Sequence, residues 1–173
     1  MSLQRRAPMK RTPFARKPAE ARHAARSKPL ARSVGHRRTR RSAGEFSAQV
    51  RLDVRTRAGR GDPEQACCEA CAVWLGAHGG QIQHRLGRKM GGSKRPVIRS
   101  AANAALLCGT PQSGCHGLCE SRDPAYHAGG FWLDEGQDPA VEPILLASDF
   151  GVLTVWLAPE GWYLSQAPEA VAS

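Results

Sequence analysis

The six cysteines of this 173-residue chain fall into two groups, and four of them have the spacing of metal ligands. Cys68 and Cys71 form a C-x-x-C pair, and Cys108 and Cys115 form a second pair after 36 intervening residues. Four thiolates around Zn²⁺ close a tetrahedral site, whose binding energy stabilises a domain with a small hydrophobic core. We therefore predict a structural zinc site made of these four cysteines.

The two remaining cysteines leave alternatives to that ligand set. Cys67 is adjacent to Cys68, and Cys119 follows Cys115 by one helical turn, so either could replace a member of the set. Paired short loops are usual in zinc knuckles, which favours Cys67 and Cys119 as small buried hydrophobic residues instead. A redox-active dithiol is a further alternative for C-x-x-C, although the glycine-rich surroundings do not resemble a βαβ unit.

The segments around the cysteines resemble the HNH endonuclease family, in particular the HNH proteins of bacteriophages and prophages. The resemblance covers about residues 67–132 and is carried, beside C-x-x-C, by QHRLGRKMGG at 83–92, SAANAALLCG at 100–109 and GCHG at 114–117. It implies an α+β fold of the small ββα-metal (His-Me finger) type, stabilised by the cysteine knuckle. In that fold one histidine ends a strand, an asparagine lies on the following loop, and a second histidine opens a helix.

The resemblance assigns catalytic roles to His84, Asn103 and His116. Hydrolysis of a phosphodiester requires an activated water, a cation that neutralises the growing charge, and in-line alignment of the reactants. A histidine with a pKa near about 6.5 can take a proton from water at neutral pH, and the resemblance makes His84 this general base. It implies that His116 binds a catalytic divalent ion and that Asn103 pins the loop and orients the base. The two imidazoles should then face one another across the ion.

Position 83 departs from the commonest form of the motif. Many family members have His or Asp before the base as a metal ligand, whereas this chain has Gln83, whose neutral amide oxygen is a weaker ligand. Glu120 follows His116 by four residues and would share its helix face, so we predict it as a second ligand beside Gln83. A solvated helix carboxylate is the alternative for Glu120. The expected ion is Mg²⁺, with Mn²⁺ or Ni²⁺ as alternatives.

Five basic residues flank the predicted base within a glycine-rich loop and are candidates for contact with DNA phosphates. They are Arg85, Arg88, Lys89, Lys94 and Arg95. Contacts with phosphates position a nucleic acid without reading its sequence, and the family's fold lays its helix and hairpin against the minor groove, which implies weak sequence dependence. A solvated loop would carry the same charges, so these contacts are a hypothesis for binding measurements.

The sequence pattern predicts short elements that would position these side chains. Apolar residues recur every four positions from Phe46 to Val54, which indicates an amphipathic helix to about residue 58. A strand is expected within 81–90, between two Gly-Gly pairs, and a second helix over 114–122, stopped by an Asp-Pro pair.

Later apolar runs predict a β-rich C-terminal part. Strands are expected at 131–133, 143–146 and 152–157, the last paired with 161–164 across a turn at 158–160. We therefore divide the chain into a basic arm (1–44), a nuclease domain with the zinc knuckle (45–133), and a C-terminal β-hairpin extension with its tail (134–173).

The positive charge is concentrated in the first 44 residues. This arm has fourteen Lys and Arg against one acid, a balance of +13, so the remainder carries −3 of the total of +10. Its poverty in large apolar residues predicts a disordered arm that binds a polyanion, above all nucleic acid, with salt-dependent affinity. A solvated or targeting tail is the alternative.

The motifs and the charge together favour a metal-dependent HNH endonuclease that nicks or cleaves DNA. One alternative is a non-catalytic zinc-stabilised nucleic-acid-binding module. Another is a zinc-ribbon RNA-binding protein, but the basic loop lacks the aromatics that stack bases. No apolar run is long enough for a membrane span or a secretory signal, so we expect a cytoplasmic protein with reduced thiols. The expected partner is DNA, and the resemblance adds phage DNA-packaging proteins as further candidates.

Overall fold

The computed structural model describes residues 45–88, 93 and 95–168. The predicted arm, Lys89 and Lys94 lie outside these residues. Helices and strands both occur in the described part, as predicted, and no helix there is long and apolar enough to cross a membrane. The helices are α2 (Ala48–Ala58), α3 (Gly114–Glu120) and α4 (Pro124–Ala128), and the strands are β1 (Gln81–His84), β2 (Ala104–Leu107), β3 (Ile144–Ser148), β4 (Gly151–Leu157) and β5 (Tyr163–Leu164). Short 3₁₀ turns occur at Pro63–Gln65, Pro96–Arg99 and Ala101–Asn103.

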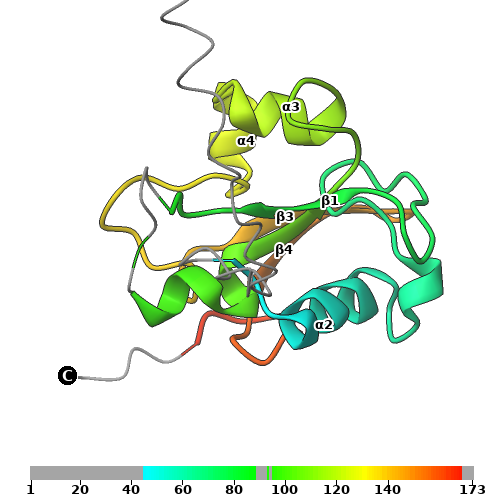
Figure 1. The fold of residues 1–173 in the computed structure, drawn as a ribbon, viewed down its shortest axis with the longest axis horizontal. Helices are drawn as coiled ribbons and strands as arrows, with labels where there is room; N and C mark the ends of the chain where they lie inside the picture. The colour runs from blue at the N-terminus through cyan, green and yellow to red at the C-terminus, as the bar shows by residue number, and fades with distance from the viewer. Residues whose placement is uncertain (1–44, 89–92, 94, 169–173) are drawn as a thin grey trace, which may run out of the picture. The chain divides into compact units, whose positions relative to one another are not determined.

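An antiparallel hairpin and the helix that follows it form the centre of the described part. β1 pairs with β2 so that Gln81 lies opposite Leu107 and His84 lies opposite Ala104. All four residues of β2 are buried, because α2 packs on one side of the hairpin and α3 lies on the other (Figure 1). The predicted strand within 81–90 is confirmed in its first four residues, whereas β2 was not predicted.

Helix α2 packs on the hairpin through Val54 and Ala58, which are buried together with Arg57. It begins where the hydroxyl of Ser47 accepts a hydrogen bond from the backbone N–H of Val50 at 3.1 Å, and its C-cap is Gly59. Val54 is buried in a cluster with Phe46, which precedes the helix, and with Leu106 of β2. Burial of a Val, Leu or Phe side chain contributes about 1.5–3 kcal/mol, so these contacts hold the helix on the hairpin. The predicted helix is confirmed.

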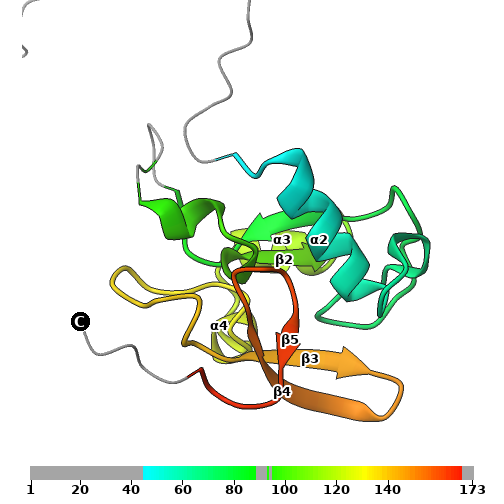
Figure 2. The ribbon, with the colours of Figure 1, turned by 90° about the horizontal axis from the view of Figure 1, so that it is seen from below.

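The strands β3, β4 and β5 form a second antiparallel sheet, seen beside the hairpin in Figure 2. The predicted pairing of β4 with the segment after the turn is confirmed in β5. Ile144 and Leu157 from this sheet are buried in one cluster with Leu107 of β2 and Cys68. The segment predicted as a C-terminal extension therefore shares the core of the preceding residues, and the two belong to one compact unit.

One prediction near residue 130 is wrong, and one helix there was not predicted. The segment 131–133 is not a strand, and Leu133 forms only an isolated bridge with Leu86. The Asp-Pro pair that was expected to stop a helix also starts one, since the carboxylate of Asp123 accepts a backbone hydrogen bond in the first turn of α4 and Pro124 is its first residue. Aspartate and proline are both favourable at a helix start, so the same pair can end one helix and begin the next.

A buried ion pair links the first cysteine loop to α2 and β2. Nε of Arg57 donates to Oε1 of Glu69 at 2.9 Å, and the two side chains are 0% and 1% exposed. Oε2 of Glu69 accepts the backbone N–H of Leu106 at 2.6 Å, and the hydroxyl of Tyr163 donates to Oε1 at 2.6 Å. The guanidinium also donates to two backbone carbonyls. Every polar atom of the pair has a partner, which offsets the desolvation of both charges.

Replacement of Arg57 by Met would leave the Glu69 carboxylate buried without its counter-charge. We expect Arg57→Met to lower the free energy of unfolding by about 3–5 kcal/mol, measured by urea denaturation of the full chain. The matched control is Arg60→Met, because Arg60 pairs with Asp149 at 3.2 Å while their side chains are 67% and 74% exposed. Its loss should change the stability by less than about 1 kcal/mol. Equal effects of the two substitutions would contradict the role of the buried pair.

Candidate metal centre and active site

The four cysteines predicted as ligands come together from two distant segments. The sulfur atoms of Cys68, Cys71, Cys108 and Cys115 all lie within 4.8 Å of one another, and those of Cys71 and Cys108 are 3.7 Å apart. Around a tetrahedral Zn²⁺ with Zn–S bonds of about 2.3 Å, neighbouring sulfurs are about 3.8 Å apart. This group could therefore hold a structural metal ion, and its donors fit Zn²⁺.

The other two cysteines lie outside this group. Cys119 is buried, with 2% of its surface exposed, as expected for a small hydrophobic residue. Cys67 is partly exposed, so its expected burial is wrong. Neither thiol competes for a place in the four-sulfur group.

The cysteine group fixes the beginning of α3. Cys108 directly follows β2, and Cys115 lies in the first turn of α3. The backbone N–H of Cys108 donates to Sγ of Cys68 at 3.3 Å, and the carbonyl of Cys108 accepts the N–H of His116 at 3.0 Å. An ion held by the cysteines would therefore keep His116 at a constant position relative to the hairpin.

Burial keeps two thiols of the cysteine group protonated. It raises the pKa of Cys68 well above the ordinary value and raises the pKa of Cys115 to about 11. Both thiols are therefore neutral near neutral pH unless a cation binds them. Binding of a metal ion would release their protons, so the affinity for the ion should fall as the pH falls.

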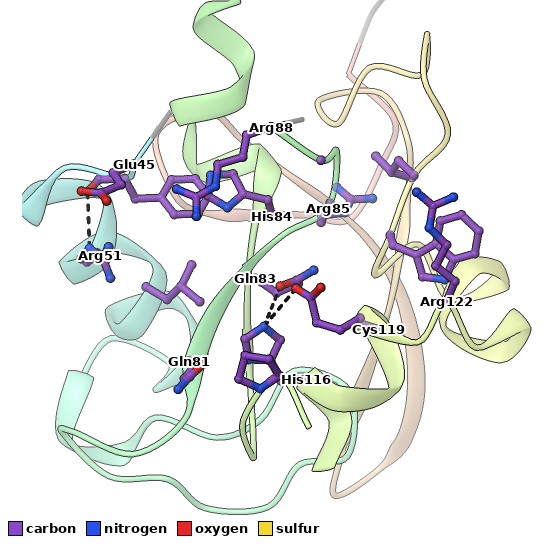
Figure 3. A pocket seen from close by; sticks show the side chains of 17 residues that line it. Glu45, Arg51, Gln81, Gln83, His84, Arg85, Arg88, His116, Cys119 and Arg122 are labelled. Carbon is purple, nitrogen blue, oxygen red and sulfur yellow. Dashed lines mark hydrogen bonds and ion pairs between the residues drawn. The ribbon is translucent and has the colours of Figure 1, made fainter. Parts of the chain in front are cut away.

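Three polar side chains converge beside the first turns of α3 (Figure 3). Nε2 of His116 lies 2.7 Å from Oε1 of Gln83 and 3.6 Å from Oε1 of Glu120. The His116 side chain is 7% exposed, and burial lowers its pKa although Glu120 acts in the opposite direction. Its Nδ1 is buried without a hydrogen-bond partner among the described residues, and the tautomer with the proton on Nε2 donates a hydrogen bond to Oε1 of Gln83.

The residues predicted to bind a catalytic ion are thus brought together. A neutral imidazole nitrogen and two oxygens are a donor set that divalent cations accept, and a cation could take the place of the proton between them. Glu120 supplies the single formal negative charge of this set. Its carboxylate is about half exposed, with 48% of the side chain accessible, so it remains reachable from the solvent.

His84 approaches the site from the other face of β1. Side chains alternate along a strand, so Gln83 and His84 leave opposite faces. The ring of His84 stacks on Phe46 with centroids 4.0 Å apart and planes at 17°. Both histidines line one pocket of about 630 Å³. The expectation that the two imidazoles face one another across an ion is therefore corrected: they border a shared pocket, and Gln83 is the direct neighbour of His116.

Asn103 fixes the chain segment that follows His84. Its buried side chain accepts the backbone N–H of Leu86 through Oδ1 at 2.6 Å. Nδ2 donates to the carbonyls of Leu86 and Ile98 at 3.1 and 3.2 Å. One amide thereby holds the two ends of the loop between these residues. Such contacts would keep His84 oriented, the role that the resemblance implies for Asn103.

Arg85 is a structural residue, and its prediction as a phosphate contact is wrong. Its side chain is fully buried, and burial lowers its pKa to about 10, which leaves the guanidinium charged near neutral pH. Its donors all have backbone acceptors at 2.6–3.1 Å, the carbonyls of Ala102, Gly130, Pro139, Glu142 and Pro143. All five N–H groups of an arginine are used, so none is left for a phosphate.

The remaining basic residues differ in their access to the pocket. Arg88 lines the pocket and is exposed, whereas Arg95 is exposed at the start of a 3₁₀ turn and is not part of the lining. Arg51 of α2 and Arg122 after α3 also line it, and the sequence analysis missed both. Arg51 lies far from the motif along the chain, and although Arg122 follows Glu120 by two residues, a single arginine beside a helix gives no signal of a shared site.

Comparisons of the chain with protein-family models, with curated proteins and with solved structures find no match. What the pocket does must therefore be inferred from its own side chains and their geometry.

Replacement of a sulfur in the four-cysteine group should remove the bound ion. We expect Cys68→Ser to lose one equivalent of Zn²⁺, measured by a colorimetric chelator assay, and to lower the melting temperature by more than about 10 °C. Cys67→Ser is the matched control, since the neighbouring sulfur lies outside the group. It should keep both the zinc and the melting temperature. Full stability of Cys68→Ser would show that the group has no structural role.

Proposed function

We propose that this chain is a metal-dependent endonuclease of the HNH type that hydrolyses DNA phosphodiester bonds. The observation that carries the proposal is the convergence of Gln83 and Glu120 on Nε2 of His116, at the wall of a pocket that His84 also lines. Metal-assisted hydrolysis of a phosphodiester needs a divalent-cation site and a base that reach the same substrate.

The order of elements supports this proposal. His84 is the last residue of β1, Asn103 immediately precedes β2, and His116 lies in the first turn of α3. A strand, a strand and a helix that carry these residues in this order agree with the ββα-metal fold that the resemblance implies. The cysteine group would bind Zn²⁺ as a structural ion that anchors α3.

In the proposed reaction His84 takes a proton from the attacking water. Gln83, His116 and Glu120 would hold the catalytic cation, with Mg²⁺ as the expected ion. When bound, this cation would neutralise charge on the phosphate and the leaving oxygen. The stack of His84 on Phe46 restricts rotation of the imidazole, so the base is held ready for the proton transfer.

Gln83 should make the affinity for the catalytic ion modest. Its amide oxygen is neutral, and Glu120 provides the only carboxylate of the three proposed ligands. Hard cations such as Mg²⁺ prefer charged oxygen ligands, so we expect a requirement for high metal concentrations. The enzyme would bind its ion most firmly when the phosphate of the substrate supplies further oxygens.

Substitution of the proposed base tests this function. We expect the wild-type chain to nick supercoiled plasmid with Mg²⁺, Mn²⁺ or Ni²⁺ and not without added metal. His84→Ala should reduce the nicking rate by about 10²–10⁴-fold while the chain still unfolds cooperatively, because the proposed base is lost. The control is His78→Ala, since His78 does not line the pocket, and it should nick at the wild-type rate.

Two outcomes would contradict the proposal in different ways. Equal nicking by His84→Ala and the wild type would exclude His84 as the base. Binding of plasmid without nicking at any metal would favour the alternative function, a non-catalytic zinc-stabilised nucleic-acid-binding module.

The arm (1–44) should supply most of the salt-dependent attraction to DNA. Each phosphate that a Lys or Arg neutralises changes the slope of log affinity against log salt by about 0.9. If four or more of its fourteen basic residues contact phosphates, deletion of the arm should flatten this slope by at least about 3, measured by fluorescence anisotropy with a duplex. Deletion of residues 169–173 is the control and should leave the slope unchanged. An unaltered slope without the arm would show that the arm takes no part in binding.

A further inference from the structure

The guanidinium of Arg122 lies over an aromatic ring at the wall of the proposed active site. Its Cζ lies 5.5 Å from the centroid of the Trp132 ring. The indole of Trp132 is fixed in turn, because its Nε1 donates to the carbonyl of Asp123 at 3.2 Å and its other neighbour, the His127 ring, lies 4.1 Å away between centroids. The ring therefore gives the guanidinium a neighbour that is itself held in place.

The charge of Arg122 is not neutralised by a neighbour in the part of the chain that the structure describes. Its guanidinium has no carboxylate partner there, whereas Arg57 and Arg60 each pair with an acid. A cation–π contact with a ring does not occupy the N–H groups of a guanidinium that point away from the ring, so they can still donate hydrogen bonds. Arg122 is also exposed, so an anion can reach these donors.

The backbone directs Arg122 towards the pocket. Its φ of 59° lies in the left-handed region, and its N–H and that of Asp123 bond back to the carbonyls of Cys119 and Leu118, which closes α3. Glycine is the residue that usually takes this position. An arginine here places a cation two residues after Glu120, in the lining of the same pocket.

We propose that Arg122, oriented by Trp132, binds a phosphodiester group of the substrate. The identity of the substrate as DNA depends on the function proposed above. A guanidinium donates two parallel hydrogen bonds to phosphate oxygens, which fixes both the position and the rotation of the group. In Figure 3, Arg122 and Arg51 lie on opposite sides of Gln83, and the carboxylate of Glu45 lies beside Arg51, so a phosphate in the pocket would be attracted more strongly to Arg122.

The test compares two arginines with the same backbone conformation. Arg60 is also exposed and also has a positive φ, of 56°, but it does not line this pocket. Full-length wild type, Arg122→Gln and Arg60→Gln are titrated with a short fluorescent DNA duplex at several salt concentrations without added divalent metal. We expect Arg122→Gln to weaken binding by about five- to tenfold and to lower the salt slope by about one, and Arg60→Gln to change neither.

A charge-conserving variant distinguishes the electrostatic attraction of the phosphate from its orientation by the guanidinium. Arg122→Lys keeps the positive charge but loses the planar guanidinium that can donate two parallel hydrogen bonds. We therefore expect it to retain the salt slope of the wild type and to nick plasmid at a lower rate. The inference would be overturned if Arg122→Gln, Arg60→Gln and the wild type bound and nicked DNA equally. If these three proteins all nicked plasmid in a metal-dependent way, the proposed endonuclease function would still stand. Loss of one unit of slope in Arg122→Gln, with no nicking by the wild type at any metal, would support the phosphate site and overturn the endonuclease function.

Discussion

The buried carboxylate of Glu69 determines how the cysteine loop, the hairpin and the C-terminal sheet fit together. It lies within the C-x-x-C loop and bonds to Arg57 of α2, to the backbone of β2 and to Tyr163 next to β4. A buried charge without such partners costs several kcal/mol, so packings that separate these elements are unfavourable. Hydrophobic burial stabilises the core, and the ion pair selects its arrangement. Because the same loop supplies two cysteines, the position of His116 also depends on this carboxylate.

Polar side chains replace regular hydrogen-bond ladders in the irregular segments around the site. Asn103 holds the loop after His84 by its amide, and Arg85 holds the segment 130–143 through its backbone carbonyls. Both side chains are buried, and a buried donor that lost its acceptor would keep its full desolvation penalty. The described residues at the ends of these segments are therefore held in place although they form little secondary structure. This rigidity allows Gln83 and His84, adjacent on β1, to present their side chains to one pocket from two faces.

Features that depend on the spacing of nearby residues could be predicted from the sequence. Features that depend on contacts between distant parts of the chain could not. The cysteine pairs and the i, i+4 relation of His116 and Glu120 identified groups that the structure brings together, because ligand spacing is a local property. Arg85 was misassigned because a basic loop does not reveal which arginine is buried against backbone carbonyls far along the chain. Strand β2 was missed because its AALL sequence has no alternation, a consequence of burial on both sides. The contact of Arg122 with Trp132 depends on a helix end and a later turn, which no spacing encodes.

The distribution of charge explains how an acidic domain could act on a polyanion. Residues after the arm carry a net −3, which would repel DNA if the charge were spread evenly. Arg57 is neutralised by Glu69, and Arg85 is buried among backbone carbonyls, so neither guanidinium can contact DNA directly. Arg88 and Arg122 instead line the pocket, where a cation interacts over short distances that salt screens weakly. On the proposed function, the arm would provide the long-range, salt-sensitive attraction, and the arginines of the pocket would align the phosphate once it arrives. Affinity and alignment would then reside in different parts of the chain, so each can be altered without the other.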